Sequence, residues 1–403
     1  MKKVLQINSV VNSGSTGRIA EDIGRVLIEN GHVSYIAFGR NDAKSASQKI
    51  KIGNKLGIYF HVLLSMIFDA HGLGSYFATK RLVRKISKIN PDAIILHNLH
   101  GYFLNIGVLS RFLARYNKKV LWTFHDAWPV TGHCTYFDSV GCEKWKIECN
   151  HCPKSTFYPS SYFFDFSQLH FKRKKKLFGG IPNLEIITPS NWLAKVVNQS
   201  FLGKINVKVI HNGIDLSIFV KLIEKSDRKL GSKPILLGVA SIWDKRKGLN
   251  DFVKLSSLMP NHQIVLIGLS KKQFESLPPE IIGVERTENI HELVSYYNQA
   301  FAFINPTYQD NFPTTNIEAL ACGTPVITYN SGGSPEAIDE HTGIVVPKGD
   351  IEGLKKAIEQ LEQVDYEELS KKCRQRAEML FDKNKRFLDY LHIIEKSVSK
   401  NDQ

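Results

Sequence analysis

The amino-acid sequence predicts an α/β chain of two doubly wound domains, and three observations support this prediction. Short apolar segments alternate along the chain with longer segments whose apolar residues recur at helical spacing. Most of the short segments are continuously apolar, as expected for parallel strands that helices cover on both faces. The chain has 403 residues, which is enough for two domains of ordinary size. We therefore predict two Rossmann-like domains.

The predicted elements follow in order from the N-terminus. A strand over residues 4–9 leads into a turn that contains Gly14 and Gly17, and the helix that follows ends at Gly31. Further strands of the first domain are predicted at residues 33–38, 93–96, 120–124 and 186–188. A second series of strands is predicted at residues 207–210, 235–240, 264–267, 302–304, 326–328 and 344–346.

The boundary between the two domains falls near residues 200–215. There the sequence His211-Asn212-Gly213-Ile214-Asp215 directly follows a predicted strand. We predict an N-terminal domain over residues 1–205, a C-terminal domain over residues 206–384 and a C-terminal helix over residues 385–403.

The charge of the chain is unevenly distributed. The net charge of +14 comes from the first part of the chain, because residues 1–180 hold 26 Lys and Arg against 11 Asp and Glu. This excess indicates an anionic partner for the first domain, such as an anionic membrane or a pyrophosphate-linked lipid. The densest basic run, residues 172–176, is either part of that surface or a solvated helix face. No aromatic interleaving accompanies this run, so nucleic acid is not an expected partner.

The most informative stretch runs from Asp310 to Glu318, with the sequence Asp-Asn-Phe-Pro-Thr-Thr-Asn-Ile-Glu. It lies between a predicted buried strand and a predicted helix, so the two carboxylates lie on either side of a helix N-terminus. The free backbone N–H groups and the positive dipole end of such a terminus suit a phosphate. A ligand with hydroxyls at both ends and phosphates in the middle, such as a nucleotide diphosphate sugar, fits this arrangement.

The whole run from Asn305 to Glu336 resembles the signature of the retaining glycosyltransferases of family 4, which have the GT-B fold. In that family one acidic residue, usually Glu, binds the donor sugar, and a second acidic residue binds the ribose. The resemblance gives these roles to Asp310, one methylene shorter than Glu, and to Glu318. The resemblance places the contacts to sugar and phosphate on the backbone of Phe312, Pro313, Thr314, Thr315 and Asn316. A chance pair of carboxylates on an ordinary capped helix is the alternative interpretation.

The GT-B resemblance also implies an arrangement of the domains. Two Rossmann-like domains would face each other across a cleft, with an acceptor bound by the first and the nucleotide sugar by the second. The helix over residues 385–403 would pack back on the N-terminal domain. The segments His97-Asn98-Leu99-His100-Gly101-Tyr102 and Trp122-Thr123-Phe124-His125-Asp126-Ala127-Trp128 are similar to enzymes of exopolysaccharide synthesis of the colanic-acid type.

A cationic turn follows the predicted strand at residues 235–240. It contains Lys245, Arg246 and Lys247, and a charged solvated turn is the alternative interpretation. Family members usually place an Arg and a Lys here on the leaving diphosphate. Lys247 matches the Lys, whereas the usual Arg position is not matched, so Arg246 or Lys245 is expected to supply the second charge. Fixed cations stabilise negative charge as it develops on the leaving group.

Candidates in the first domain lie where strands end, which is where open α/β sheets bind ligands. His125 ends one predicted strand, and the family has a His at the matching place that contacts the donor sugar. Gly14 and Gly17 either line the same cleft or form a structural turn. His97 and His100 are candidates for acceptor contacts, and hydrogen-bonded core histidines are the alternative.

Four of the six cysteines lie close together in one loop of the first domain, beside His133 and His151. The spacing includes one Cys-x2-Cys knuckle but is not a standard pair of knuckles. A structural zinc site is one interpretation, and free thiols or disulfides are the others. The cysteines are Cys134, Cys142, Cys149 and Cys152. The sequence has no Asp-x-Asp pair, so no catalytic metal is expected.

The cellular location is predicted from two features. No secretion signal is visible before the first strand, which indicates a cytoplasmic protein. The apolar segment over residues 58–68 is interpreted as a core helix, and an amphipathic helix lying on the cytoplasmic face of the inner membrane is the alternative.

Together these observations predict a retaining, metal-independent transferase of the hexosyltransferase type. It would move a sugar from a UDP- or GDP-sugar to a glycan or lipid-linked oligosaccharide in bacterial exopolysaccharide synthesis. A GT-B-like protein that binds a sugar nucleotide, or an epimerase, is the first alternative. A glycoside hydrolase is the second, although its carboxylates would have to converge on one anomeric carbon.

Overall fold

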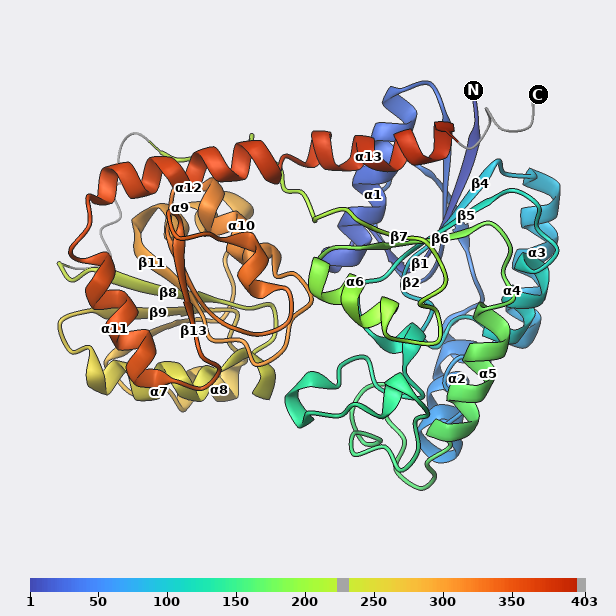
Figure 1. The fold of residues 1–403 in the computed structure, drawn as a ribbon, viewed down its shortest axis with the longest axis horizontal. Helices are drawn as coiled ribbons and strands as arrows, with labels where there is room; N and C mark the ends of the chain where they lie inside the picture. The colour runs from blue at the N-terminus through green and yellow to red at the C-terminus, as the bar shows by residue number, and fades with distance from the viewer. Residues whose placement is uncertain (223–231, 397–403) are drawn as a thin grey trace. The chain divides into compact units, whose positions relative to one another are not determined.

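The computed structural model describes residues 1–222 and 232–396, and it divides into two compact units (Figure 1). Unit 1 consists of Met1–Ile210 together with the C-terminal segment from Phe387, and unit 2 is His211–Arg386. Of the predicted C-terminal helix, the part beyond Lys396 lies outside the described residues.

Unit 1 contains a seven-stranded sheet of order β3-β2-β1-β4-β5-β6-β7, and every pairing in it is parallel. The central strands are continuously buried because helices cover both faces of the sheet. The strands are β1 (Lys3–Val11), β2 (Val33–Asp42), β3 (Gln48–Lys51), β4 (Ala93–Leu96), β5 (Lys119–Thr123), β6 (Leu184–Thr188) and β7 (Val207–Val209).

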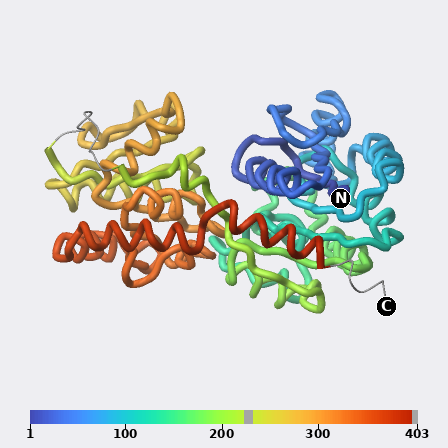
Figure 2. The backbone as a smooth tube through the Cα atoms, turned by 90° about the horizontal axis from the view of Figure 1, so that it is seen from above, coloured from blue at the N-terminus to red at the C-terminus, as the bar shows by residue number. Residues whose placement is uncertain are grey.

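The helices of unit 1 form two layers. On one face, Ile19 and Ile23 of α1 share a buried cluster with Phe387 and Leu391, which lie in the part of α13 that belongs to unit 1. Figure 2 traces the backbone of both helices. Helices α3 to α6 contribute to the cluster on the opposite face. Their bounds are α1 (Gly14–Glu29), α2 (Lys55–Phe68), α3 (Tyr76–Ile89), α4 (Ile106–Leu113), α5 (Ser167–Phe178), α6 (Asn191–Asn198) and α13 (Lys383–Lys396).

Unit 2 contains a six-stranded parallel sheet of order β10-β9-β8-β11-β12-β13. Its strands are β8 (Ile235–Val239), β9 (Gln263–Ile267), β10 (Ile281–Val284), β11 (Ala300–Asn305), β12 (Val326–Tyr329) and β13 (Gly343–Val346). Its helices are α7 (Leu249–Leu258), α8 (Lys271–Glu275), α9 (Ile290–Gln299), α10 (Thr314–Ala321), α11 (Ile351–Leu361) and α12 (Tyr366–Leu380). Both sheets are therefore Rossmann-like, which confirms the predicted fold class.

Two sequence predictions about individual elements were wrong. The strand predicted at residues 207–210 was assigned to the second series, but β7 pairs in parallel with β6, from Ile186 opposite Val207 to Thr188 opposite Val209. It therefore forms the edge of the first sheet. The segment over residues 58–68 was interpreted as a core helix, but the only side chains that α2 buries are the polar ones of His61 and Ser65. Its large apolar side chains are half-buried, or exposed in the case of Leu56, Tyr59, Phe60, Leu63 and Phe68.

Candidate functional site

The N-terminus of α10 in unit 2 lies at the carboxyl edge of the sheet, directly after β11. The side-chain amide of Asn316 fixes the helix in this place. Its oxygen accepts from Nδ2 of Asn305 at 2.7 Å, and its own Nδ2 donates to the carbonyl oxygen of Ser334 at 3.1 Å. Pro313 precedes the helix and gives it no side-chain cap, so Thr314 and Thr315 begin a helix whose dipole end carries no acidic neighbour in its first turn.

Asp310 and Lys247 form an ion pair beside this terminus. Nζ of Lys247 lies 2.7 Å from Oδ2 of Asp310, and each side chain is 19% exposed. Lys247 ends a short 3-10 turn, η4 (Lys245–Lys247), that follows β8. The structure thus brings together a cation and a carboxylate that are 63 residues apart in the sequence. A ligand that reaches both groups must share or break their mutual contact.

The two neighbouring cations of this turn differ in their surroundings. The guanidinium of Arg246 donates twice to Oδ2 of Asp244, at 3.0 and 2.8 Å, and once to the carbonyl oxygen of Gln309 at 3.4 Å. Its position is therefore fixed next to the loop that carries Asp310. Lys245 is exposed to solvent. Of the two residues predicted to supply the second charge, Arg246 has the more ordered position.

Glu318 lies one turn inside α10 and is oriented by a residue that the sequence analysis missed. The hydroxyl of Tyr297, on α9, donates to Oε2 of Glu318 at 3.0 Å. Tyr297 is fully buried, and burial first, then the charge of Glu318, raises its pKa well above the usual range. It therefore stays a hydrogen-bond donor and holds the carboxylate in one orientation. Its place on a helical apolar face gave no sign of this contact.

The loop after β12 packs directly on Asp310. The backbone N–H of Gly333 donates to the carbonyl oxygen of Asp310 at 3.2 Å. Gly332 has φ of 57°, and a Cβ atom there would lie 1.8 Å from the same oxygen, so only glycine fits. The next side chain, Ser331, is 1% exposed, and its hydroxyl has no hydrogen-bond partner among the described residues. Ser331 is a second site candidate that sequence reasoning missed.

Phe312 is packed rather than presented to solvent. Its ring is 4% exposed and stacks on His211 with 4.9 Å between the ring centroids and 17° between the planes. Nδ2 of Asn212 donates to the carbonyl oxygen of Phe312 at 3.5 Å. The backbone N–H of Asn316 is bonded to the carbonyl oxygen of Pro313 at 3.2 Å. The predicted amide contacts to a ligand are therefore left to Thr314, Thr315 and the backbone of the preceding turn.

In unit 1 the end of β5 carries His125, and a chain of hydrogen bonds sets its tautomer. Nε2 of Gln6 donates to the carbonyl oxygen of Ala20 at 2.7 Å, so Oε1 of Gln6 accepts from Nε2 of His97 at 3.0 Å. Nδ1 of His97 then accepts from Nε2 of His125 at 3.1 Å. The remaining nitrogen of His125, Nδ1, is consequently an acceptor.

Burial keeps these histidines neutral. Desolvation lowers the pKa of His125 to about 4, against the opposing charge of Asp126, and lowers that of His97 well below its usual value. His100 has a different partner, since its Nε2 lies 2.6 Å from Oδ2 of Asp126 and its Nδ1 lies 3.1 Å from the hydroxyl of Tyr158. A neutral His125 with an acceptor nitrogen is suited to a hydroxyl group.

The glycines of the first turn have different roles. Gly14 begins α1 with φ of 62°, and no atom would meet a Cβ there. At Gly17 a Cβ would lie 3.0 Å from Cγ2 of Val10 and 3.2 Å from the backbone nitrogen of Asn12. Gly17 therefore lets α1 pack closely on the end of β1. Ser13 gives the helix no side-chain cap.

The four clustered cysteines all line one cavity in unit 1, and all are free thiols. A second polar cluster, Asp69, His71 and His133, is fully buried in the same unit, and its ligand atoms lie within 4.8 Å of one another. The residues of both clusters lie far apart in the sequence or in irregular segments, and both clusters offer side chains of the kinds that bind metals.

The chain matches two family models. The model described as Glycosyltransferase Family 4 matches residues 16–218, and that described as Glycosyl transferases group 1 matches residues 221–379. A colanic acid biosynthesis glycosyl transferase of Escherichia coli K12, WcaC, is 27% identical over 86% of this chain and 88% of that protein. The O-antigen chain mannosyltransferase RfbU of Salmonella typhimurium is 23% identical over 60% of this chain and 63% of that protein.

Solved structures with the same fold cover the chain end to end. Sucrose-phosphate synthase from Thermosynechococcus elongatus has a TM-score of 0.73 and 17% identity, with 100% of both chains covered. HepE of Anabaena, in complex with UDP and glucose, has a TM-score of 0.68 and 14% identity over 98% of this chain and 100% of that one. Among the described residues, no helix is both long and apolar enough to cross a bilayer. The chain belongs to glycosyltransferase family 4 and has the GT-B fold.

Proposed function

We propose that this glycosyltransferase is a retaining, metal-independent enzyme that moves a sugar from a nucleotide sugar to a glycan acceptor. One observation carries the proposal: Lys247 and Asp310 lie in contact beside the uncapped N-terminus of α10, with Glu318 one turn further along. The cation and the helix terminus suit the negatively charged diphosphate of such a donor. The two carboxylates suit the hydroxyl groups at its two ends.

Each residue of unit 2 then has a distinct task. Glu318, oriented by Tyr297, would accept hydrogen bonds from the ribose hydroxyls. Asp310 would accept a hydrogen bond from the donor sugar. Lys247 would move from Asp310 to the diphosphate as that leaving group gains negative charge. Arg246, whose guanidinium is fixed near Gln309, would supply the second positive charge.

A metal-free mechanism is supported by the groups that could replace the metal. The sequence contains no Asp-x-Asp pair to hold a divalent ion on the diphosphate. Lys247, Arg246 and the dipole of α10 together offer the positive potential that a metal would otherwise provide. In the retaining step the leaving phosphate oxygen would take the proton of the acceptor hydroxyl, which attacks the same face of the sugar. No protein nucleophile is then required.

Two further details come from relatives. HepE was solved with UDP and with UDP-glucose, which favours a UDP-sugar as donor over a GDP-sugar. The relatives named for colanic acid and O-antigen synthesis favour a growing bacterial polysaccharide, or its lipid-linked precursor, as acceptor. We assign acceptor binding to unit 1. We also expect His125 of this unit to contact the donor sugar through Nδ1.

We also propose that unit 1 binds an anionic membrane surface peripherally. The outward face of α2 carries Leu56, Tyr59, Phe60 and Leu63 at helical spacing, and each is more than half exposed. The residues that α2 buries are polar, since Nε2 of His61 accepts from the backbone N–H of Gly74 at 3.1 Å. One apolar face of α2 therefore points to solvent in unit 1, while Ile58 of the same helix packs against the core.

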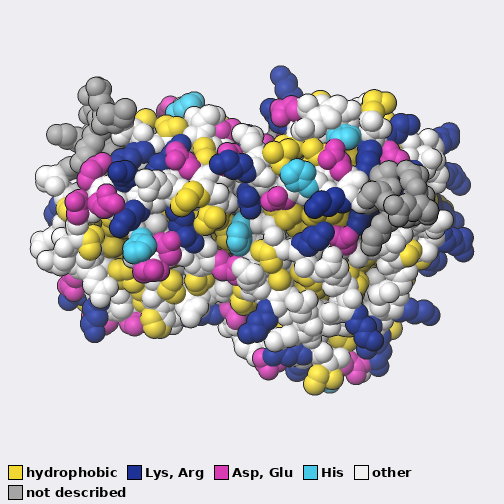
Figure 3. Space-filling model, turned by 45° about the horizontal axis from the view of Figure 1, so that its top comes forward, with side chains coloured by type: hydrophobic (Ala, Val, Ile, Leu, Met, Phe, Trp, Pro, Cys, Tyr) yellow, Lys and Arg dark blue, Asp and Glu magenta, His cyan; other side chains and the backbone are white. Residues whose placement is uncertain are grey.

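Neighbouring segments enlarge this apolar face. The loop before α5 is tied to α2 by a hydrogen bond from the backbone N–H of Tyr162 to the carbonyl oxygen of Met66, at 2.9 Å. The ring of Phe164 stacks on Phe68 at 6.0 Å, and Phe163 is 75% exposed. Exposed cations also lie at the start of α2 and along α3, namely Lys55, Lys80, Arg81, Arg84 and Lys85. Lys and Arg side chains are frequent on the surface that unit 1 presents in Figure 3. Aromatic rings bordered by Lys and Arg suit an anionic bilayer interface.

A nucleotide-binding experiment tests the enzymatic proposal. Thermal unfolding of the full chain is measured with UDP, GDP, ADP and dTDP, each with and without EDTA. We expect one nucleotide, UDP, to stabilise the protein by the same increment in both conditions. Glu318→Ala should abolish that increment, whereas Glu359→Ala, an exposed carboxylate on α11, should preserve it.

Product analysis then separates the alternatives. The matching UDP-sugars are incubated with a polysaccharide-precursor lipid, and the anomeric configuration of the product is determined by NMR. Transfer with retention supports the proposal, and inversion overturns the mechanism. Sugar release from glycans without nucleotide would indicate a hydrolase. Tight nucleotide-sugar binding with an epimerised or unchanged sugar would indicate the epimerase or binding-protein alternative.

A further inference from the structure

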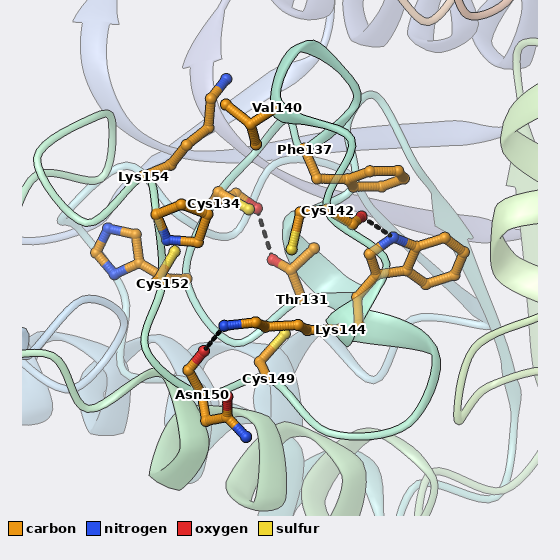
Figure 4. Close-up of a pocket in the computed structure, with 13 residues that line it drawn as sticks. Thr131, Cys134, Phe137, Val140, Cys142, Lys144, Cys149, Asn150, Cys152 and Lys154 are labelled. Atoms are coloured by element: carbon orange, nitrogen blue, oxygen red, sulfur yellow. Dashed lines mark hydrogen bonds between the residues drawn. The ribbon is translucent and has the colours of Figure 1, made fainter.

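The Cys-rich segment of unit 1 brings four thiols to the lining of one cavity. Cys134, Cys142, Cys149 and Cys152 lie in the connection between β5 and α5, which contains only short 3-10 turns. In Figure 4 their sulfur atoms surround the same space. All four are free thiols; Cys134 and Cys149 are buried and the other two half-buried. Such convergence from an irregular segment calls for an explanation beyond apolar packing.

We propose that these four cysteines bind a structural Zn²⁺ ion. Four thiolates form the closed tetrahedral ligand set that zinc adopts in structural sites, with Zn–S bonds of about 2.3 Å. No three of the four sulfurs lie within 4.8 Å of one another, so metal binding would draw them inward. The connection between β5 and α5 contains only short 3-10 turns, which we expect to accommodate such a contraction. This proposal is independent of the donor site in unit 2.

Backbone N–H groups point at two of the four sulfurs, those of Cys149 and Cys152. The backbone N–H of Gly132 donates to Sγ of Cys149 at 3.2 Å. The backbone of Lys154 hydrogen-bonds Cys152, and the side chain of Cys152 hydrogen-bonds that of Cys134. N–H groups aimed at sulfur stabilise thiolates, as the hydrogen bonds around a metal's ligands do.

The turn between the last two cysteines has the form that a Cys-x2-Cys ligand pair needs. His151 has a left-handed backbone, with φ of 42°, which few residues other than glycine adopt. This turn places Cys149 and Cys152 on the same cavity, while His151 itself is exposed. The strained position thus has a structural consequence, because it brings the two thiols to one place.

Positive charge near the cavity balances a site with four thiolates. Zinc with four thiolates carries a net charge of −2, which is costly to bury without cations. Lys144 and Lys154 line the cavity. Lys174 is fully buried and lies within electrostatic reach of Cys134 and Cys149. Its Nζ donates to the carbonyl oxygens of Trp128 at 2.7 Å and Thr131 at 3.1 Å, which fix it beside the segment.

The carboxylate and imidazole cluster of the same unit is a poorer metal site, although its atoms are closer together. The indole N–H of Trp128 donates to Nδ1 of His71 at 3.2 Å, so the proton of a neutral His71 is on Nε2. Nε2 of His71 lies 3.6 Å from Oδ1 of Asp69. Because this nitrogen carries the proton, it has no lone pair to offer to a metal. Oδ1 of Asp69 is instead 2.9 Å from Nδ1 of His133. The one carboxylate of this cluster, that of Asp69, lies within electrostatic reach of Lys174. The positive charge of Lys174 makes the binding of a metal cation there less favourable.

Metal analysis of the full chain tests the proposal. Protein purified without chelators under reducing conditions is analysed by mass spectrometry of its elements and by intact native mass. We expect about one zinc per chain, and loss of that zinc in Cys149→Ser and in Cys152→Ser. Cys373→Ser and Cys322→Ser, buried cysteines of unit 2, should retain it. Asp69→Asn should retain it too, because the imidazole cluster is not the site.

A second measurement uses the unaltered chain, in case a variant fails to fold. Cobalt exchanged into the protein should give sulfur-to-metal charge-transfer absorption and the intense visible bands of tetrahedral Co²⁺. A mercurial reagent that binds thiols should release one zinc per chain.

Three results would overturn the proposal. The first is a wild-type chain without zinc, whose cluster thiols all react freely or are paired as disulfides. The second is iron in place of zinc. The third is zinc that Asp69→Asn loses and Cys149→Ser keeps.

Discussion

The candidate site residues of the two units differ in charge and exposure, although both sets lie at the edges of parallel sheets. In unit 2 the candidate residues are charged and partly exposed, and they lie around a helix terminus, as the contact of Lys247 with Asp310 illustrates. In unit 1 desolvation keeps His97 and His125 neutral, and Gln6, His97 and His125 form a chain of hydrogen bonds. Under the proposed function, unit 2 would bind the charged part of the ligand and unit 1 would bind hydroxyl groups.

The largest expected effect concerns the cations of unit 2. Lys247→Ala should lower turnover by about 10²-fold or more, because a fixed charge that stabilises the leaving group is lost. Arg246→Ala should have a comparable effect. Lys245→Ala is the matched control, since Lys245 is exposed, and its loss should be small. Steady-state kinetics measure all three. Equal losses at positions 245 and 247 would show that the turn acts as a diffuse charge.

Acid should destabilise unit 1 before unit 2. Burial lowers the pKa of His61, His125 and His170 to about 4, so between pH 6.5 and 4 their unfolded forms bind more protons than their folded forms. Stability therefore falls as the pH falls through this window. In unit 2 burial lowers the pKa of His262, but the charge of Glu362 opposes this effect.

Hydrogen exchange resolved by unit, at several pH values, measures this difference. We expect the amides of unit 1 to lose protection first as the pH drops from 6.5 to 4. Loss of protection in unit 2 at a higher pH than in unit 1 would contradict the comparison.

His125 should affect turnover without affecting nucleotide binding. His125→Ala removes one hydrogen bond to a hydroxyl, which is worth about tenfold in turnover. Gln6→Ala should also lower turnover, because His97 would no longer be held in one tautomer. A changed pH profile of turnover would identify this effect. His392→Ala, an exposed histidine on α13, is the control. Weaker stabilisation by UDP in His125→Ala would show that unit 1 also contacts the nucleotide.

The smallest effect is expected at the membrane. Tyr59→Ser combined with Phe60→Ser should reduce co-sedimentation with vesicles that contain anionic phospholipid by several-fold, because two exposed rings are lost. Ile242→Ser, at an equally exposed position in unit 2, should leave co-sedimentation unchanged. If the double variant still binds the vesicles and loses this binding at high salt, the cations alone account for membrane binding.

Much of the fold could be predicted because its signals are local. Strand β4 is a continuous apolar run and β9 contains one, and both are almost fully buried. Strand β3 was missed because Gln48–Lys51 has only one buried residue and lies at the sheet edge. β7 was assigned to the wrong series, since a strand's own residues do not say which sheet it joins.

The candidate site divides in the same way. The spacing of Asp310 and Glu318 was readable because both lie within one short segment. The partners that orient them were not, because Tyr297 and Lys247 come from elements elsewhere in the chain. In α2 the sequence showed an apolar helix but not its orientation. That orientation follows from Gly74, where a Cβ would lie 2.5 Å from the ring of His61, so that the histidine packs inward.

The sequence by itself determined the class of sheet, the family and the segment that carries the two acidic residues. These properties depend on periodicity and on motifs, which are written in neighbouring residues. Only the tertiary structure decided that Lys247 contacts Asp310, that three residues fix the tautomer of His125, and that four thiols share a cavity. Such contacts join residues from separate elements, and their geometry exists only once the sheets have formed and packed.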